Sequence, residues 1–277
     1  MISLGTVATR VDGRLKPTAE TQRLLDGADE ALAAGDVRLF IRTVTDSASE
    51  RSVYSEWSRR GVINGVMLLD AAGRDPRVTL LRRLKLPVVA YAEAGQIPTC
   101  PAVTYDDAYA ADLLLTRLAG AGHRSVLYLG GAQPPEMFER RRRSLADAGA
   151  AHGVAVQTHH PDGDAAVGAI LSRASLAKTK VTAVLAGDDE LVASSATHLA
   201  AAGLAVPLDV SLIAWADSPY CSSREHPITA LNSEARTTGA LMAETLVRML
   251  EGGEELVVAA PNPVIIERGS IAVPQKD

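Results

Sequence analysis

Apolar and polar positions between residues 181 and 219 follow one another in a strand–helix–strand order. Residues 181–186 form an unbroken apolar run, which is typical of a strand buried on both faces of a sheet. An amphipathic stretch follows and ends at Gly203, a favoured residue after a helix C-terminus. A second apolar run covers residues 210–215. The pattern predicts two parallel strands joined by a crossover helix.

The same alternation continues along most of the chain. It predicts strands over residues 2–8, 37–44, 62–69, 88–91, 103–105, 125–129, 154–157, 228–231, 255–259 and 264–267. It predicts helices over residues 18–34, 48–60, 80–84, 107–118, 136–152, 165–174 and 233–250. Strands and helices that alternate at short intervals are typical of parallel α/β sheets. Breaks near residues 103 and 231 divide the pattern into two halves, which suggests two lobes with a cleft between them.

Acidic turns follow two neighbouring strands of the predicted sheet. Asp188 and Asp189 come directly after the first apolar run, and Asp217 follows the second. Ligands of open parallel sheets bind beyond the carboxyl ends of the strands. Each aspartate taken alone is equally well explained as a helix cap or a turn former. The two turns together favour a site for a polar ligand.

Composition limits the classes of protein that fit. The 277 residues are 47% hydrophobic but only 4% aromatic, so we expect a core built mainly of Ala, Val, Leu and Ile. The formal net charge of −5 argues against a constitutive nucleic-acid-binding surface, which needs a basic face. The sequence shows neither a signal peptide nor an apolar run of about 20 residues. We therefore expect a cytoplasmic protein that makes no membrane contact.

The motifs of metal sites and active sites are not found in this sequence. Cys100 and Cys221 lack the CxxC spacing of zinc sites. The histidines and aspartates of residues 159–164 are explained as well by the composition of a polar loop as by a metal site. The chain has no GxSxG elbow, no Ser–His–Asp order and no P-loop spacing. We expect no enzymatic activity, no cofactor and no metal.

Five short motifs follow one another along the chain. They are LPVV at 86–89, DD at 106–107, GHR at 122–124 followed by GG at 130–131, AAAGLAVPLDVSLI at 200–213 and PITAL at 227–231. Their order resembles that of the effector-binding core of LacI/GalR-type bacterial transcription regulators. The fourth motif is the strongest, because it is similar to that family's reaGlrvPeDvSvig. The set spans nearly the whole chain, and its order makes it specific although each motif alone is weak.

The resemblance implies a two-lobed fold like that of periplasmic binding proteins, with three crossovers between the lobes. We expect an N-terminal lobe of residues 1–104 plus 232–256 and a C-terminal lobe of residues 105–231 plus 257–277. The resemblance also implies a homodimer and a small-molecule effector, a sugar or another polar metabolite, in the cleft. Family members usually begin with a helix-turn-helix headpiece, whereas Met1 here already lies in the first expected strand. Operator DNA is therefore expected to be bound only through a headpiece that this chain lacks.

The family's ligand-binding positions carry over one at a time. Its cleft arginine matches Arg141, whose guanidinium would clamp hydroxyls or a carboxylate. Asp188 stands where the family has Asn, and Ala216 precedes Asp217 where the family has two aspartates, which argues against an ordinary sugar. Trp215 is interpreted either as a stacking face for the ligand or as a core residue. Further candidates, at strand ends of the other lobe, are Asp12, Arg14, Asp46, Asp70 and Glu93.

Three functions are compatible with these observations. The favoured hypothesis is the effector-binding and dimerisation core of a LacI-type regulator, in which the ligand shifts the dimer between DNA-binding states. The second is a solute-binding protein of a transporter, which has the same fold; the missing signal peptide argues against it. The third is an α/β enzyme, such as a hydrolase or a sugar-modifying protein; the missing catalytic motifs argue against it.

Overall fold

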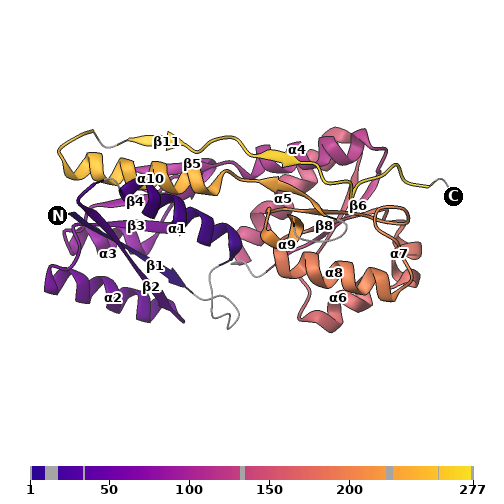
Figure 1. Cartoon of the computed structure of the whole chain (residues 1–277), viewed down its shortest axis with the longest axis horizontal. Coiled ribbons are helices and arrows are strands. Elements are labelled where there is room, and N and C mark those ends of the chain that lie inside the picture. The colour runs from indigo at the N-terminus through magenta and orange to yellow at the C-terminus, as the bar shows by residue number, and fades with distance from the viewer. Residues whose placement is uncertain are drawn as a thin grey trace. The chain divides into compact units, whose positions relative to one another are not determined.

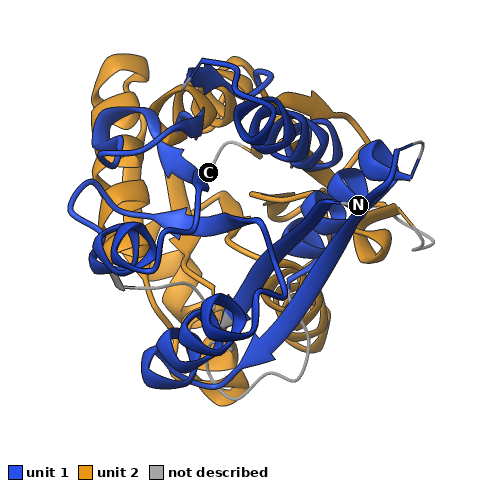
Figure 2. Cartoon of the chain, turned by 90° about the vertical axis from the view of Figure 1, so that its left-hand side faces the viewer, with its two compact units in different colours: residues 1–106, 234–262 blue, residues 107–233, 263–277 orange. Residues whose placement is uncertain are grey.

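Two compact units make up the chain (Figures 1 and 2). The computed structural model describes residues 2–9, 18–33, 35–131, 135–222, 227–254 and 256–275. Unit 1 comprises residues 1–106 and 234–262, and unit 2 comprises residues 107–233 and 263–277, so the chain passes between the units three times. The third passage comes later than the expected boundary at residue 256, because the strand at 257–259 pairs within unit 1.

Unit 1 is built on a six-stranded sheet in the order β11-β5-β4-β3-β1-β2, in which all neighbours are parallel. Its strands are β1 (Ile2–Thr9), β2 (Val37–Val44), β3 (Gly65–Ala71), β4 (Val88–Glu93), β5 (Ala102–Tyr105) and β11 (Val257–Ala259). Its helices are α1 (Ala19–Leu32), α2 (Ser47–Arg60), α3 (Pro76–Arg83), the short 3-10 turn η1 (Ala94–Gln96) and α10 (Ala235–Leu250).

Helices cover both faces of the unit 1 sheet. Successive side chains of a strand point to opposite faces, so Leu4 and Met67 pack with α1 and α10. Val66 and Leu68 pack with α2 and α3 on the other face. Burial on both faces explains why these strands have no polar alternation in the sequence.

Unit 2 has a second six-stranded sheet, in the order β12-β10-β9-β8-β6-β7. Its strands are β6 (Ser125–Leu129), β7 (Ala155–His159), β8 (Ala183–Ala186), β9 (Ser211–Ala214), β10 (Thr229–Asn232) and β12 (Val264–Ile266). Its helices are α4 (Asp107–Gly120), α5 (Pro135–His152), α6 (Asp164–Ile170), α7 (Arg173–Thr179), α8 (Asp189–Ala201) and α9 (Pro219–Ser222). Only the β10–β12 pair is antiparallel among the strand pairs of the described residues.

Two apolar clusters hold unit 2 together, one on each face of its sheet. Leu127 and Val184 belong to the cluster that includes residues of α6, α7 and α8. Tyr128 and Leu185, the next residues along the same two strands, belong to the cluster that includes residues of α4 and α5. Because both faces are covered by helices, polar groups can meet the sheet mainly at the strand ends.

The expected α/β architecture with parallel sheets is confirmed, and several elements differ from the expected ones in their bounds, such as α3, which begins at Pro76 rather than at Leu80. The single helix expected over 165–174 is wrong: α6 ends at Ile170, and α7 begins after Ser172, whose Oγ accepts from the amide of Ser175 at 3.3 Å. Residues 219–222, for which no element was expected, form α9. Strand β3 begins at Gly65 rather than Val62, whose amide still donates to a carbonyl of α2. None of the helices in the described ranges combines the length and apolar character needed to cross a membrane.

Candidate functional site

Asp188 lies between the end of β8 and the start of α8. Its backbone is extended, so the side chain turns back over the first turn of the helix, and Oδ1 accepts from the amide of Leu191 at 2.8 Å. The residue is only 8% exposed. Its other carboxylate oxygen lies against Gly131, which follows β6. The capping role predicted for Asp188 is confirmed, and the carboxylate is held at the carboxyl edge of the sheet.

Arg141 projects from α5 onto the start of α4. Its Nε donates to Asp107 Oδ1 at 3.3 Å, and Nε of Arg140 donates to Asp107 Oδ2 at 3.2 Å. Two guanidinium groups therefore share one carboxylate that is 3% exposed. In the sequence, Asp107 stands out only as the second residue of the DD motif at 106–107. Its pairing with Arg140 and Arg141 is a contact across two helices that no local signal predicts.

Trp215 supports the guanidinium of Arg141. The guanidinium carbon lies 4.5 Å from the centroid of the indole, a geometry that favours a cation over an aromatic face. Trp215 is 3% exposed and packs against Tyr128, with ring centroids 5.9 Å apart. Of the two interpretations of Trp215, the structure favours the core residue, and the contact on its ring is Arg141.

Asp217 follows β9 and forms a two-point ion pair with Arg268. Arg268 donates from Nη1 and Nη2 to the two carboxylate oxygens, at 2.7 and 2.9 Å. Its Nη1 also donates to the carbonyl of Ile228 at 2.9 Å. The hydrogen bond with Asp217 raises the pKa of Arg268, against a smaller opposite effect of burial. Sequence reasoning missed Arg268; the only local signal is a single cation two residues after the short apolar run of β12.

The candidates from the other half of the chain fall into two groups, of which the first contains Asp12, Arg14 and Asp46. Asp12 and Arg14 lie outside the described residues. Asp46 caps α2, because its Oδ1 accepts from the amide of Ser49 at 2.8 Å. This backbone hydrogen bond, together with the Ser49 hydroxyl, lowers the pKa of Asp46. Asp46 is exposed at the carboxyl end of β2.

The second group contains Asp70 and Glu93, at the carboxyl ends of β3 and β4. Asp70 has a left-handed backbone, with φ 48, at the point where the β3–β4 pairing shifts register. Nη2 of Arg77 donates to the carbonyls of Leu69 and Asp70, at 3.1 and 3.0 Å, and so fixes this irregular strand end. Glu93 is 8% exposed. Both belong to unit 1, whereas Arg141 belongs to unit 2.

The carboxyl edge of the unit 2 sheet therefore carries the chemistry for binding hydroxyl groups. Arg141 and Trp215 are in contact, and Asp188 and Asp217 follow the neighbouring strands β8 and β9. Guanidinium groups supply donors only and carboxylates supply acceptors only, so a ligand that both donates and accepts fits this set. Across the described part of the chain, no group of three or more His, Cys, Asp or Glu side chains is placed to hold a metal ion.

The chain is similar in sequence to a family of binding domains and to regulators that contain one. The periplasmic binding protein-like domain family matches residues 115–271, more than half of the chain. The HTH-type transcriptional regulator AglR of Rhizobium meliloti (strain 1021) is 26% identical over 219 residues, which are 75% of this chain and 61% of AglR. The chain thus spans about three fifths of the length of this relative.

Solved structures show the same fold. A LacI family transcriptional regulator from Bifidobacterium animalis subsp. lactis DSM 10140 superposes with a TM-score of 0.87 and 25% identity, covering 99% of this chain and 98% of that chain. A cellobiose complex of the transcriptional regulator CelR superposes with a TM-score of 0.81 and 22% identity, covering 97% of this chain and 84% of that chain. This chain belongs to the periplasmic binding protein-like domain family and is homologous to LacI/GalR-type helix-turn-helix regulators.

Proposed function

We propose that this chain is the effector-binding and dimerisation core of a LacI-type transcription regulator, with a polar small molecule bound at the carboxyl edge of the unit 2 sheet. The observation that carries the proposal is the guanidinium of Arg141, held between Asp107 and the face of Trp215 at that edge. AglR is named as an HTH-type regulator, and this chain spans about three fifths of it. We therefore assign operator binding to a segment outside this chain.

The effector we propose is a sugar or a related polyhydroxylated metabolite. The guanidinium can donate to one hydroxyl, and the buried carboxylates beside it can accept from the next, which suits a ligand with several hydroxyls. The cellobiose bound in the CelR structure, which shares the fold, supports this class. The proposed contacts from unit 2 are Arg141, Asp188 and Asp217, and Trp215 acts through the guanidinium that lies on its ring. Asp12, Arg14, Asp46, Asp70 and Glu93 are separate candidates in unit 1.

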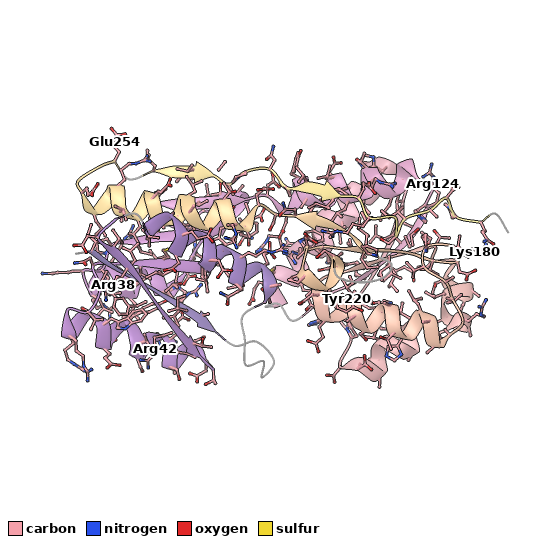
Figure 3. All side chains as sticks on the ribbon, in the orientation of Figure 1. Arg38, Arg42, Arg124, Lys180, Tyr220 and Glu254 are labelled. Carbon is pink, nitrogen blue, oxygen red and sulfur yellow. The ribbon has the colours of Figure 1, made fainter. Side chains whose placement is uncertain are left out.

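The effector would act by linkage. A ligand that binds one conformation of the dimer better than the other shifts the population by its difference in affinity. We propose that the chain is a homodimer, and β2 supports this, because it is the edge strand of its sheet among the strands of the described residues. Phe40 and Ile41 on β2 are 39% and 44% exposed, and exposed large hydrophobic side chains can mark an interaction surface. The same strand carries Arg38 and Arg42 (Figure 3).

Thermal unfolding in the presence of sugars tests the proposal. Cellobiose, sucrose and ribose come first, followed by sugar acids, polyols and nucleosides. A ligand at about 100 times its Kd adds roughly 2.7 kcal/mol to the free energy of unfolding, which is a measurable shift. Arg141→Ala should remove the shift. Arg142→Ala is the matched control on the same helix, since its side chain is 42% exposed and pairs only with Glu139 among the described residues.

Two results would contradict the proposal. If no compound shifts the unfolding temperature, an effector of this class is rejected. If a compound binds equally well to wild type and to Arg141→Ala, the site is not the one described. Turnover of the bound compound would favour an enzyme instead.

A further inference from the structure

A cavity of about 410 Å³ opens at the other edge of the unit 2 sheet, where β6 and β8 begin. Its lining includes Arg124, Ser125, Lys180, Thr182 and Gln275. Ser125 is the first residue of β6, and Thr182 directly precedes β8. The proposed effector site lies beyond the opposite ends of the same strands. A strand of four residues spans about 13 Å, so the two sites are separate.

Two cations dominate the polar lining of this cavity. Arg124 and Lys180 are both exposed, and Figure 3 shows them at the same end of unit 2, beside the C-terminal segment. Neither forms an ion pair with a carboxylate of the described residues. Two cations that line one cavity and pair with no carboxylate of the described residues favour a local positive potential, although the whole chain carries a net charge of −5. The cavity therefore attracts anions more strongly than the surface around it.

Backbone carbonyls hold the guanidinium of Arg124, and Lys180 has an unusual backbone conformation. Nη1 of Arg124 donates to the carbonyls of Ala119 and His123, at 3.1 and 2.9 Å, which fixes the guanidinium against its own turn. Lys180 ends α7 in the left-handed conformation, with φ 53, a position that glycine or asparagine fills with less strain. Side chains that are fixed before binding lose less entropy when the ligand arrives. The fixed guanidinium of Arg124 therefore suits recognition better than a mobile surface cation would.

The remaining lining defines the kind of anion. Gln275, Ser125 and Thr182 add polar groups to the lining. The hydroxyls of Ser125 and Thr182 also form hydrogen bonds within the protein, to the carbonyl of Thr179 at 3.3 Å and to His123 Nδ1 at 2.8 Å, so the two cations are the main ligands for an anion. Val273 and Pro274 form an apolar wall on the C-terminal side. We propose that this cavity is a second ligand site that binds a small organic oxyanion, a molecule with a phosphate or carboxylate group beside an apolar or neutral body. Arg124 and Lys180 bind the oxyanion, and the C-terminal segment packs against the body.

Calorimetric titration at constant ionic strength tests this site. The probes are glycerol 3-phosphate, succinate and inorganic phosphate, which separate phosphate from carboxylate recognition and both from binding of a bare ion. The variants are Lys180→Asn, which keeps a residue that accepts the left-handed backbone, and Arg124→Gln. Wild type should bind one organic probe saturably, and each variant should bind it about tenfold more weakly, because a charged hydrogen bond is lost.

The control is Arg83→Gln, which removes an exposed cation from α3 in unit 1 and should leave the affinity unchanged. Lys180→Asn keeps the test valid even if Arg124→Gln loosens its turn. The site is rejected if none of the probes binds saturably. It is also rejected if the two variants bind as wild type does, which would mean an adventitious ion only. Arg141→Ala should not alter this binding, so the outcome is independent of the effector site.

Discussion

The carboxylate of Asp188 lies in the space that a side chain at Gly131 would occupy. A Cβ atom built on Gly131 would be 2.1 Å from Asp188 Oδ2 and 2.5 Å from its Cγ. Gly131 follows β6 and Asp188 follows β8, and these strands are neighbours in the sheet. The absence of a side chain at one strand end therefore permits a buried acidic cap at the next.

Gly131→Ala should displace Asp188 from this position. The methyl group would force the carboxylate away from the amide of Leu191, so both the helix cap and the proposed ligand contact would be lost. We expect the free energy of unfolding to fall by about 1–3 kcal/mol, measured by urea titration, as for overpacking of a tight site. Effector binding, once a ligand is known, should weaken in the same variant.

The control is Gly120→Ala, at the end of α4 in the same unit. A Cβ there meets no atom within 4 Å, so this change should be neutral or stabilising, since alanine favours a helix. Equal stability of Gly131→Ala and wild type would show that Asp188 has room to move, which contradicts the close contact.

Local patterns were sufficient to predict much of the fold. The apolar run at 181–186, the aspartate after it and Gly203 predict β8, the start of α8 and its end, because each signal lies within a few residues of the element. The helix break at Ser172 was missed because the periodicity of α6 and α7 is nearly continuous, and a single side chain ends one and caps the other.

The candidate site was less predictable, because its contacts join distant residues. The resemblance identified Arg141, but its partner Asp107 lies 34 residues away, and Arg268 lies 51 residues from Asp217. Periodicity and capping signals act over one or two turns, so they carry no information about such pairs. The close approach of Asp188 to Gly131 could not be predicted for the same reason, since it depends on the relative positions of two strands.

Arg268→Met should destabilise unit 2 by about 3 kcal/mol, because it leaves the largely buried carboxylate of Asp217 without its two-point partner. Glu267→Gln is the matched control one residue earlier. It breaks an ion pair with Arg117 that is more exposed, and exposed pairs contribute less than about 1 kcal/mol. Both changes are measured by chemical unfolding. Similar losses in the two variants would show that the Asp217–Arg268 pair contributes no more than a surface pair.

His123 should make the folded state sensitive to mild acid. The residue is 1% exposed, with Nδ1 hydrogen-bonded to Thr182 Oγ1 at 2.8 Å, and burial lowers its pKa from the ordinary 6.5. Below pH 6.5 the unfolded chain therefore binds a proton that the folded chain does not, so stability is full above that value and falls as the pH decreases through the folded pKa.

The measurement for His123 is urea unfolding at pH 7.5 and pH 5.5, a range above the titration of ordinary carboxyl groups. Wild type should lose more stability over this interval than His123→Gln, which has no titrating ring. An identical loss in both proteins would assign the pH dependence to other histidines.

Among the ionic side chains around α3 in unit 1, we expect the removal of Arg77 to lower the free energy of unfolding most. Its guanidinium pairs with Asp75 at 2.7 Å and with Glu50 at 3.1 Å, and both carboxylates are less than a tenth exposed. Burial raises the pKa of Tyr54, which therefore stays protonated and donates to Glu50 at 2.8 Å. Arg77→Met leaves the two buried carboxylates without a cation, and we expect the free energy of unfolding to fall by about 3–5 kcal/mol.

Arg77→Met should also release the end of β3, because the carbonyls of Leu69 and Asp70 lose their donor. Hydrogen exchange of the amides that follow Leu69 should become faster in this variant. Tyr54→Phe should lower the free energy of unfolding by only about 1 kcal/mol, since one hydrogen bond is lost and Arg77 remains. Arg83→Met on the same helix is the control, because Arg83 is exposed and its change should stay within about 0.5 kcal/mol of wild type. If Arg77→Met matches this control in stability and in exchange at β3, the left-handed turn at Asp70 is held by the strand itself and not by the guanidinium.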